Sequence, residues 1–232
     1  MIKAVFFDLY QTLIRHDPPY AESLSQIIGD FGIEITADEL RCPVAIADEF
    51  IYKEHSRLSI NQRSHENKMS LFSKYHSILL KEADIEPTAE LIHHNIIKMQ
   101  QIDFKRVLFD DVLPVLKQLK QNGFILGLIS NVDSDINPLL NKLGLTPLLQ
   151  VVVTSQGSGY HKPQPQIFRQ AAIQASVEPE ESMYIGDQYQ VDVLGAEEAG
   201  MQGVLLDRNS FSPDNIQEPI INNLYQLTEH LS

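Results

Sequence analysis

The side chains best suited to catalysis in this 232-residue sequence stand where short apolar segments end. The first is Asp8, which comes at the end of the run "IKAVFFDL". A carboxylate in that position can act as a nucleophile and divide a hydrolysis into two easier steps through a covalent intermediate. Thr12 follows closely, and Ser130 with Asn131 ends a later run, "FILGLISN". Polar groups at these places can bind and orient a charged substrate.

Three further charged residues follow the later apolar runs. Lys162 lies in "GYHKPQPQIF", and Asp187 and Asp192 lie in "YIGDQYQVDVLGA". Because a phosphoryl group carries dispersed negative charge, the ammonium of Lys162 can stabilise it during transfer. Asp8 and Asp187 would repel each other at close range unless a cation lay between them. Mg²⁺ prefers such oxygen ligands, so these acids predict a Mg²⁺ site.

Residues 1–16 and 105–232 carry the repeating pattern of a parallel α/β core domain. Their apolar runs are nearly continuous rather than alternating, which is typical of strands covered on both faces. The expected strands are 2–9, 124–131, 149–155, 182–187 and 203–207. Helical segments alternate with them and predict a Rossmann-like, doubly wound parallel sheet. Since ligands of such sheets bind outside the carboxyl ends of the strands, the polar residues above are expected to converge there.

Residues 17–104 contain no convincing strand and are expected to form a helical domain inserted into the sheet domain. Helical patterns cover 20–32, 36–56, 64–83 and 87–101. In the third, apolar residues at spacings of three and four predict one buried stripe, made of Met69, Phe72, Tyr75, Ile78 and Leu79. Pro43 lies inside the second and is expected to break or kink it.

The order of the polar residues resembles the haloacid dehalogenase-like hydrolase superfamily. Its pattern is D-x-D-x-T, then a Ser or Thr, then a Lys, then G-D followed by another acid. The counterparts here are 8–12 ("DLYQT"), Ser130, Lys162 and 186–192 ("GDQYQVD"). The helical insert is similar to the cap that many members carry between the first and second motifs, the C1 position.

The resemblance implies a role for each of these residues. The expected catalytic residues are Asp8 as nucleophile, Tyr10, Thr12, Ser130 and Lys162. The expected substrate contacts come from Ser130, Asn131, Lys162 and Gln11. The expected Mg²⁺ ligands are the carboxylates of Asp8, Asp187 and Asp192 and the backbone carbonyl of Tyr10.

Tyr10 is the main departure from the phosphatases of that superfamily, which carry a second aspartate there. That aspartate protonates the leaving oxygen, and losing such a group typically costs on the order of 10²–10⁴-fold in rate. A phenol with an ordinary pKa of about 10 is a poor base at neutral pH. Gln11 similarly replaces a usual glycine. The 2-haloacid dehalogenases of the superfamily do carry tyrosine at this position, together with a later Ser-Asn pair like Ser130-Asn131.

The fourth motif and the helical insert favour a phosphatase. The fourth motif of the dehalogenases reads S-S-N-x-x-D, where this chain has Gly186-Asp187. A metal-free displacement does not need the carboxylate of Asp187. Their halide-binding arginine has Ile46 as its nearest counterpart. We therefore expect a Mg²⁺-dependent phosphatase that acts on a small phosphorylated metabolite through an aspartyl phosphate on Asp8. A metal-free 2-haloacid dehalogenase is the alternative, and a weakly active ligand- or partner-binding member of the superfamily is the second.

The composition excludes several other classes. A formal net charge of −13 disfavours binding to nucleic acids and to anionic membranes. The single cysteine, Cys42, allows no intrachain disulfide, and no run of 18 consecutive apolar residues predicts a membrane span. With no signal-peptide pattern before the first strand, we expect a cytoplasmic protein. The oligomeric state stays open.

Overall fold

The computed structural model describes residues 1–210 and 216–231, and the chain divides into two compact units. The sheet unit comprises Met1–Arg15 and Val107–Ser232, and the helical unit comprises His16–Arg106. The chain passes between the units within β2 (Ile14–Asp17) and within β3 (Lys105–Leu108), and these two strands pair in a small sheet of their own. The expectation that residues 17–104 form a cap domain stays a prediction.

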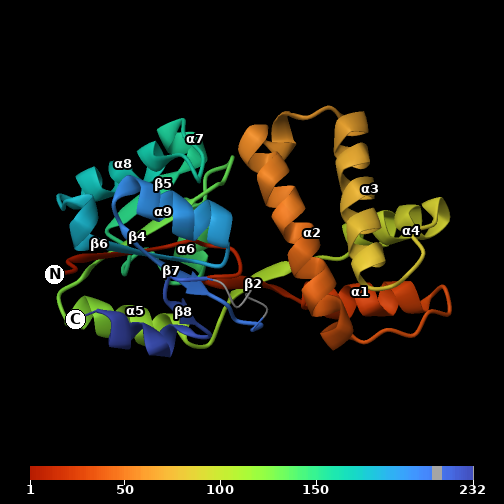
Figure 1. The fold of residues 1–232 in the computed structure, drawn as a ribbon, viewed down its shortest axis with the longest axis horizontal. Coiled ribbons are helices and arrows are strands. Elements are labelled where there is room, and N and C mark those ends of the chain that lie inside the picture. Colours follow the sequence, from red (N-terminus) through yellow and green to blue (C-terminus); the bar gives the residue numbers. More distant parts are fainter. Residues whose placement is uncertain (211–215, 232) are drawn as a thin grey trace. The chain divides into compact units, whose positions relative to one another are not determined.

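The sheet unit contains one sheet whose strand order is β5-β4-β1-β6-β7-β8, and every pair in it is parallel (Figure 1). The strands are β1 (Ala4–Phe7), β4 (Ile125–Ser130), β5 (Val151–Thr154), β6 (Ser182–Gly186), β7 (Gln202–Leu206) and β8 (Ile220–Ile221). From β1 the chain first winds to one side through β4 and β5, and then to the other through β6 and β7. The doubly wound, Rossmann-like sheet is therefore confirmed, and β1 lies at its switch point.

Helices cover both faces of this sheet, which explains the unbroken apolar runs. Along β1, Val5 and Phe7 belong to one buried cluster, and Ala4 and Phe6 belong to another. The first cluster includes residues of α5 (Val112–Gln121) and α6 (Asn137–Lys142). The second includes residues of α8 (Pro165–Ala175) and α9 (Leu194–Ala199). Since successive strand residues point to opposite faces, both sets must be apolar.

The helical unit is built from α1 (Tyr20–Gly29), α2 (Ala37–Arg57), α3 (His65–Glu82) and α4 (Ala89–Gln100). Thr36 begins α2 with a capping box, because its side chain accepts from the Glu39 N–H while Glu39 accepts from the Thr36 N–H. Of the two expected effects of Pro43, a break does not occur, since α2 continues through it, and a kink stays a prediction. A proline removes only one helical hydrogen bond, and packing of α2 against α1 and α3 holds the rest.

The buried face of α3 differs from the predicted stripe. Tyr75 and Leu79 are buried as expected, but the remaining predicted residues are only half-buried: Met69, Phe72 and Ile78. The buried set is Leu71, Tyr75, His76, Leu79 and Leu80. The face is shifted because α3 packs against both α2 and α4.

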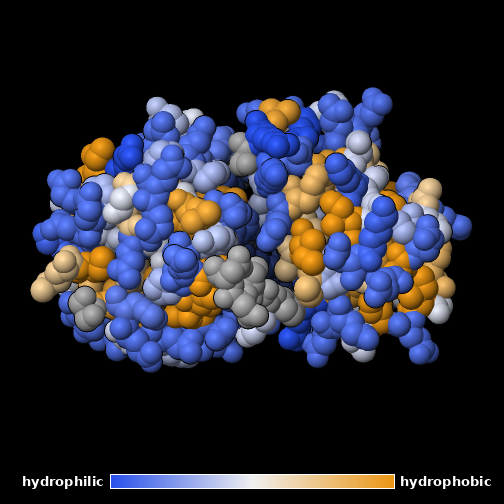
Figure 2. Space-filling view, viewed as in Figure 1, coloured by the Kyte–Doolittle hydropathy of each residue, from blue (hydrophilic) through white to orange (hydrophobic). Residues whose placement is uncertain are grey.

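Apolar side chains also reach the surface of the helical unit over α2 and α3, as Figure 2 shows. Ile46 of α2 is an exposed apolar residue of this unit, with 39% of its surface accessible. Shorter elements complete the chain: α7 (Ser155–Ser158), the 3₁₀ turns Ile60–Gln62, Pro179–Glu181 and Leu224–His230, and a π-helical turn at Tyr189–Val193. None of the helices in the described part of the chain combines the length and apolar character needed to cross a membrane.

Candidate active site

Four adjacent strands bring the predicted site residues together at their carboxyl ends. Asp8 directly follows β1, Ser130 ends β4, and Asp187 directly follows β6. Lys162 lies in the loop between α7 and α8, after β5. Asp192 lies in the π-helical turn after β6. The strand order β5-β4-β1-β6 therefore gathers residues from distant parts of the sequence at one edge of the sheet.

Lys162 joins two of the carboxylates. Its Nζ lies 2.6 Å from Oδ1 of Asp8 and 2.6 Å from Oδ1 of Asp192, and all three side chains are buried. Burial alone would lower the pKa of the Lys162 ammonium, but the negative charges of Asp192 and Asp8 outweigh it and leave that pKa raised. A permanent positive charge is thus fixed beside Asp8.

Asp8 is oriented by hydrogen bonds with residues of β4 and β6 and with Lys162. The Ser130 hydroxyl donates to Oδ1 over 3.2 Å, the same oxygen that Lys162 contacts, and the Asp8 N–H donates to the Ile185 carbonyl over 2.9 Å. Burial raises the pKa of the Asp8 carboxyl, Lys162 opposes the rise, and the charge of Asp192 adds to it. The arrangement holds a buried carboxylate in one orientation, which a nucleophile requires.

Three carboxylates form a group that can hold a metal ion. One oxygen each from Asp8, Asp187 and Asp192 lies within 4.8 Å of the other two. Burial raises the pKa of the Asp187 carboxyl well above its ordinary value, and the charges of Asp192 and Asp8 raise it further. A cation among these oxygens would remove that repulsion, and an all-oxygen donor set suits a hard divalent ion.

Asp192 has partners for both of its oxygens. Oδ1 receives Lys162 Nζ, and Oδ2 accepts the Gln188 N–H over 3.1 Å. The absence of a side chain at Gly186 makes room, because a Cβ there would lie 2.3 Å from the Asp192 carboxyl carbon. These contacts equip Asp192 to hold Lys162 in place.

Tyr184 is a site residue that the sequence analysis missed. It is fully buried in β6, and its hydroxyl accepts from Lys162 Nζ over 3.0 Å. The same hydroxyl lies 3.0 Å from the Ile129 carbonyl and 3.2 Å from Asp192 Oδ1, to either of which it can donate. In the sequence it is one residue of an apolar strand, and its only signal is that a buried tyrosine hydroxyl needs a partner.

Thr12 and Asn131 lie beside the charged group. Thr12 is fully buried, and its hydroxyl lies 3.5 Å from Oδ1 of Asp187. The side-chain amide of Asn131 accepts the Lys162 N–H over 2.7 Å and donates to the Lys162 carbonyl over 3.0 Å. Asn131 thereby fixes the backbone from which the Lys162 side chain extends. Its expected contact with a substrate stays a prediction.

Tyr10 and Gln11 lie in a tight turn after Asp8. Gln11 has a φ of 59°, in the left-handed region that favours glycine, and its N–H donates to the Ile14 carbonyl over 2.8 Å. The Tyr10 ring packs against the first core cluster of the sheet unit. The catalytic role of Tyr10, its carbonyl as a metal ligand and the substrate contact of Gln11 stay predictions.

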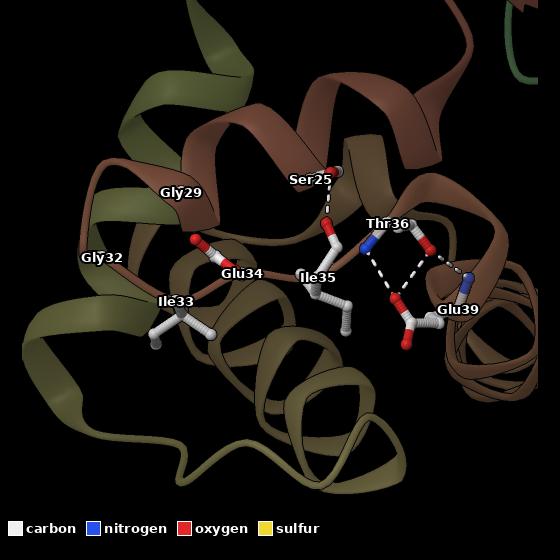
Figure 3. Close-up of a pocket in the computed structure, with 8 residues that line it drawn as sticks. All are labelled: Ser25, Gly29, Gly32, Ile33, Glu34, Ile35, Thr36 and Glu39. Carbon is white, nitrogen blue, oxygen red and sulfur yellow. Dashed lines mark hydrogen bonds between the residues drawn. The ribbon is translucent and has the colours of Figure 1, made fainter.

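A pocket of about 590 Å³ lies in the helical unit and contains none of the predicted site residues. It is lined by Ser25, Gly29, Gly32, Ile33, Glu34, Ile35, Thr36 and Glu39 (Figure 3). Ser25 donates to the Ile35 carbonyl, and Thr36 and Glu39 bond to each other in the capping box. Ser25, Thr36 and Glu39 therefore already have structural partners.

Known proteins resemble this chain along most of its length. The family model of the haloacid dehalogenase-like hydrolases matches residues 2–200. A glyceraldehyde 3-phosphate phosphatase of Methanopyrus kandleri is 29% identical over 216 residues, which cover 91% of this chain and 86% of that protein. The crystal structure of a HAD phosphatase from Thermococcus onnurineus is 25% identical with a TM-score of 0.61, covering 100% and 98% of the two chains. A 2-haloacid dehalogenase from Pseudomonas syringae pv. Tomato DC3000, 24% identical with a TM-score of 0.56 over 100% and 98%, shares the fold.

Proposed function

The chain belongs to the haloacid dehalogenase-like hydrolases, and on that premise we propose that it is a Mg²⁺-dependent phosphatase of a small phosphorylated metabolite. The observation that carries the proposal is the approach of Asp8, Asp187 and Asp192 to within 4.8 Å. Displacement of a halide at carbon has no use for the acid at Asp187, whereas phosphoryl transfer uses a metal to neutralise charge. The phosphatase relative described above supports a phosphate ester as the substrate.

In the first step, a carboxylate oxygen of Asp8 attacks phosphorus, and the bond between phosphorus and the ester oxygen of the substrate breaks. Lys162 and Ser130 stabilise the phosphoryl oxygens and keep Asp8 oriented. In the second step, water attacks phosphorus, inorganic phosphate leaves, and the Asp8 carboxylate is restored. A Mg²⁺ ion held by Asp8 and Asp187, with Asp192 close by, would neutralise charge between the nucleophile and the phosphoryl group.

Tyr10 makes the second step the slower one. A phenol can protonate a leaving oxygen, but it is a weaker base than a carboxylate for activating water. We therefore expect the aspartyl phosphate to accumulate, so that substrate alcohol appears in a burst before steady turnover. A Tyr10→Asp variant should lose the burst and gain steady-state turnover by on the order of 10²-fold.

The dehalogenase alternative rests on Tyr10 and on the Ser130-Asn131 pair. In the structure, Asn131 bonds to the backbone of Lys162, so the pair has a use that does not involve a halide. Ile46, the nearest counterpart of the halide-binding arginine, is apolar and 39% exposed. Both observations support the phosphatase.

The test measures phosphate release from glyceraldehyde 3-phosphate and from a panel of phosphomonoesters, and halide release from 2-chloropropionate. Each assay is run with Mg²⁺ and with a chelator, on the unaltered protein and on Asp8→Asn. We expect phosphate release that requires both Mg²⁺ and Asp8. Halide release that is indifferent to chelator would establish the dehalogenase instead. No turnover in either assay, together with retained Mg²⁺ binding, would support the weakly active binding protein.

A further inference from the structure

Arg208 lies outside the residues of the candidate site, just after β7, and its side chain is only 13% exposed. Its two terminal nitrogens form a bidentate ion pair with Asp111, at 2.9 Å to Oδ2 and 3.0 Å to Oδ1. Nη2 also donates to the backbone carbonyl of Thr12 over 2.9 Å. The guanidinium stacks on Phe109, 3.8 Å from the ring centroid. One side chain therefore joins an acid, an aromatic ring and the backbone of the first motif.

The acid partner is itself fixed. Asp111 is 4% exposed and directly precedes α5, and its Oδ2 also accepts the Leu224 N–H over 2.8 Å. Phe109 and Asp111, with Asp111 held in turn by Leu224, thus fix the guanidinium in one orientation. A buried arginine held in this way is pre-organised for a second acceptor, which here is the Thr12 carbonyl.

The turn that receives this hydrogen bond connects Asp8 to the rest of the chain. Within the turn, the Leu9 carbonyl accepts the N–H groups of Leu13 and Ile14, both at 2.9 Å. Gln11 stands in the left-handed region at a φ of 59°, which is unfavourable for a residue with a side chain. Arg208 bonds the carbonyl directly after this residue, and the Thr12 hydroxyl lies 3.5 Å from Asp187.

We propose that Arg208, oriented by Asp111, is a positioning residue that holds the strained turn after Asp8 in its catalytic geometry. The inference rests on the proposed function, since the reaction that it affects is the attack by Asp8. Ser130 and Lys162 come from other segments of the chain and keep their own contacts, so loss of Arg208 changes kcat far more than KM. A lysine cannot bond Asp111 through two nitrogens while bonding Thr12, because it lacks the planar fork.

The test compares Arg208→Ala and Arg208→Lys with matched changes at Arg63 in the helical unit. The Arg63 side chain is also 13% exposed, pairs with Glu54 and donates to the Glu54 carbonyl over 2.7 Å. We expect kcat of both Arg208 variants to fall by on the order of 10²-fold, because small misplacement of reacting groups has effects of that size. Changes in KM should stay within about twofold, the Arg63 variants should keep their kcat, and added guanidinium ion should restore part of kcat only in Arg208→Ala.

A second measurement does not depend on activity. Hydrogen exchange at the Leu13 and Ile14 amides should be faster in both Arg208 variants, while exchange in β6 and in the helical unit stays unchanged. If the folded variants keep both kcat and this protection, the inference is overturned. If Arg208→Ala fails to fold, Arg208→Lys carries the test with the same outcomes. Absence of Asp8-dependent turnover in the unaltered protein would overturn the proposed function, while the exchange measurement would still decide the role of Arg208.

Discussion

The buried charged side chains at the edge of the sheet unit are paired with one another, whereas two buried polar side chains of the helical unit have polar atoms without a partner among the described residues. At the edge of the sheet, Asp8, Asp192 and Lys162 share hydrogen bonds, and Tyr184 joins two of them. In the helical unit Asn95 is fully buried, yet neither its amide oxygen nor its amide nitrogen has a hydrogen-bond partner among the described residues. Nδ1 of the buried His76 likewise has no hydrogen-bond partner among the described residues.

This contrast separates two ways of keeping polar groups inside a protein. A buried polar group without a partner lowers the free energy of unfolding. The apolar cluster of the helical unit has to offset that loss. A buried charge network with complete partners holds charged side chains ready for a ligand at little further cost in reorganisation. Removing one member of such a network, however, leaves the others uncompensated.

The largest effect is therefore expected for Lys162→Met in the sheet unit. Without the ammonium, Asp8 and Asp192 lie buried beside each other with no opposite charge, which should lower the free energy of unfolding by about 3–5 kcal/mol. Activity should fall by at least on the order of 10²-fold, because the phosphoryl group loses a fixed cation. Urea unfolding in chelator and phosphate release measure the two effects. Lys117→Met, at an exposed lysine of the same unit, should change stability by less than about 0.5 kcal/mol.

Most of the sheet and most of the charged group could be predicted because both are encoded locally. Continuous apolar runs mark strands with two covered faces, and parallel strands place their following residues at one edge. Asp8, Ser130 and Asp187 each stand directly at a strand end, so their convergence follows from strand order alone.

Residues whose role depends on packing were not predictable. Tyr184 stands within an apolar strand, and only the position of Lys162 turns its hydroxyl into a site group. Arg208 stands in a polar loop, and its partner Asp111 is 97 residues away. The strands β2 and β3 contain charged residues and are not covered on both faces, and β8 has only two residues, so none of the three presents the continuous apolar run that marked the other strands.

Asp48 offers a milder test of the comparison. It is a carboxyl of the helical unit that accepts a hydrogen bond from the Tyr75 hydroxyl over 3.0 Å. Burial raises its pKa to about 7, so the folded state favours the protonated form. Its contribution to stability is complete below the unfolded pKa of 3.8 and is lost as pH rises through about 7. Allowing for partial exposure, stability should fall by about 2 kcal/mol between about pH 5 and about pH 8.

Urea unfolding of Asp48→Asn should lack this fall, because asparagine accepts the same hydrogen bond without a charge. Glu49→Gln, at the exposed neighbouring position, should retain it. A fall of equal size in Asp48→Asn would mean that another group produces it. The burial of the Asp48 carboxylate would then be offset by its contacts, contrary to the contrast drawn between the two units.

Asn95→Leu tests the unpaired amide directly. Replacing it with an apolar side chain of similar size removes the desolvation penalty of two polar atoms, so the free energy of unfolding should rise by about 1–2 kcal/mol. Asn95→Asp should lower it, because a buried charge needs even more compensation. If Asn95→Leu is instead less stable than the unaltered protein, the amide is satisfied by bound water and the two units are more alike than their direct contacts indicate.

Gln11→Gly has the smallest expected effect and asks whether the sheet unit also stores backbone strain beside its paired charges. A left-handed conformation costs a residue with a side chain roughly 1–2 kcal/mol, while glycine loses about 0.5–1 kcal/mol more chain entropy on folding, so a net gain of about 0.5 kcal/mol is expected. The same change at Gln101, which has a φ of −85° at the end of α4, relieves no strain and should lower stability by about 0.5–1 kcal/mol. Urea unfolding should therefore show changes in the free energy of unfolding that are opposite in sign for the two variants. Equal losses at both sites would mean that contacts of the Gln11 side chain outweigh the strain, which would make this glutamine part of the site's fixed geometry.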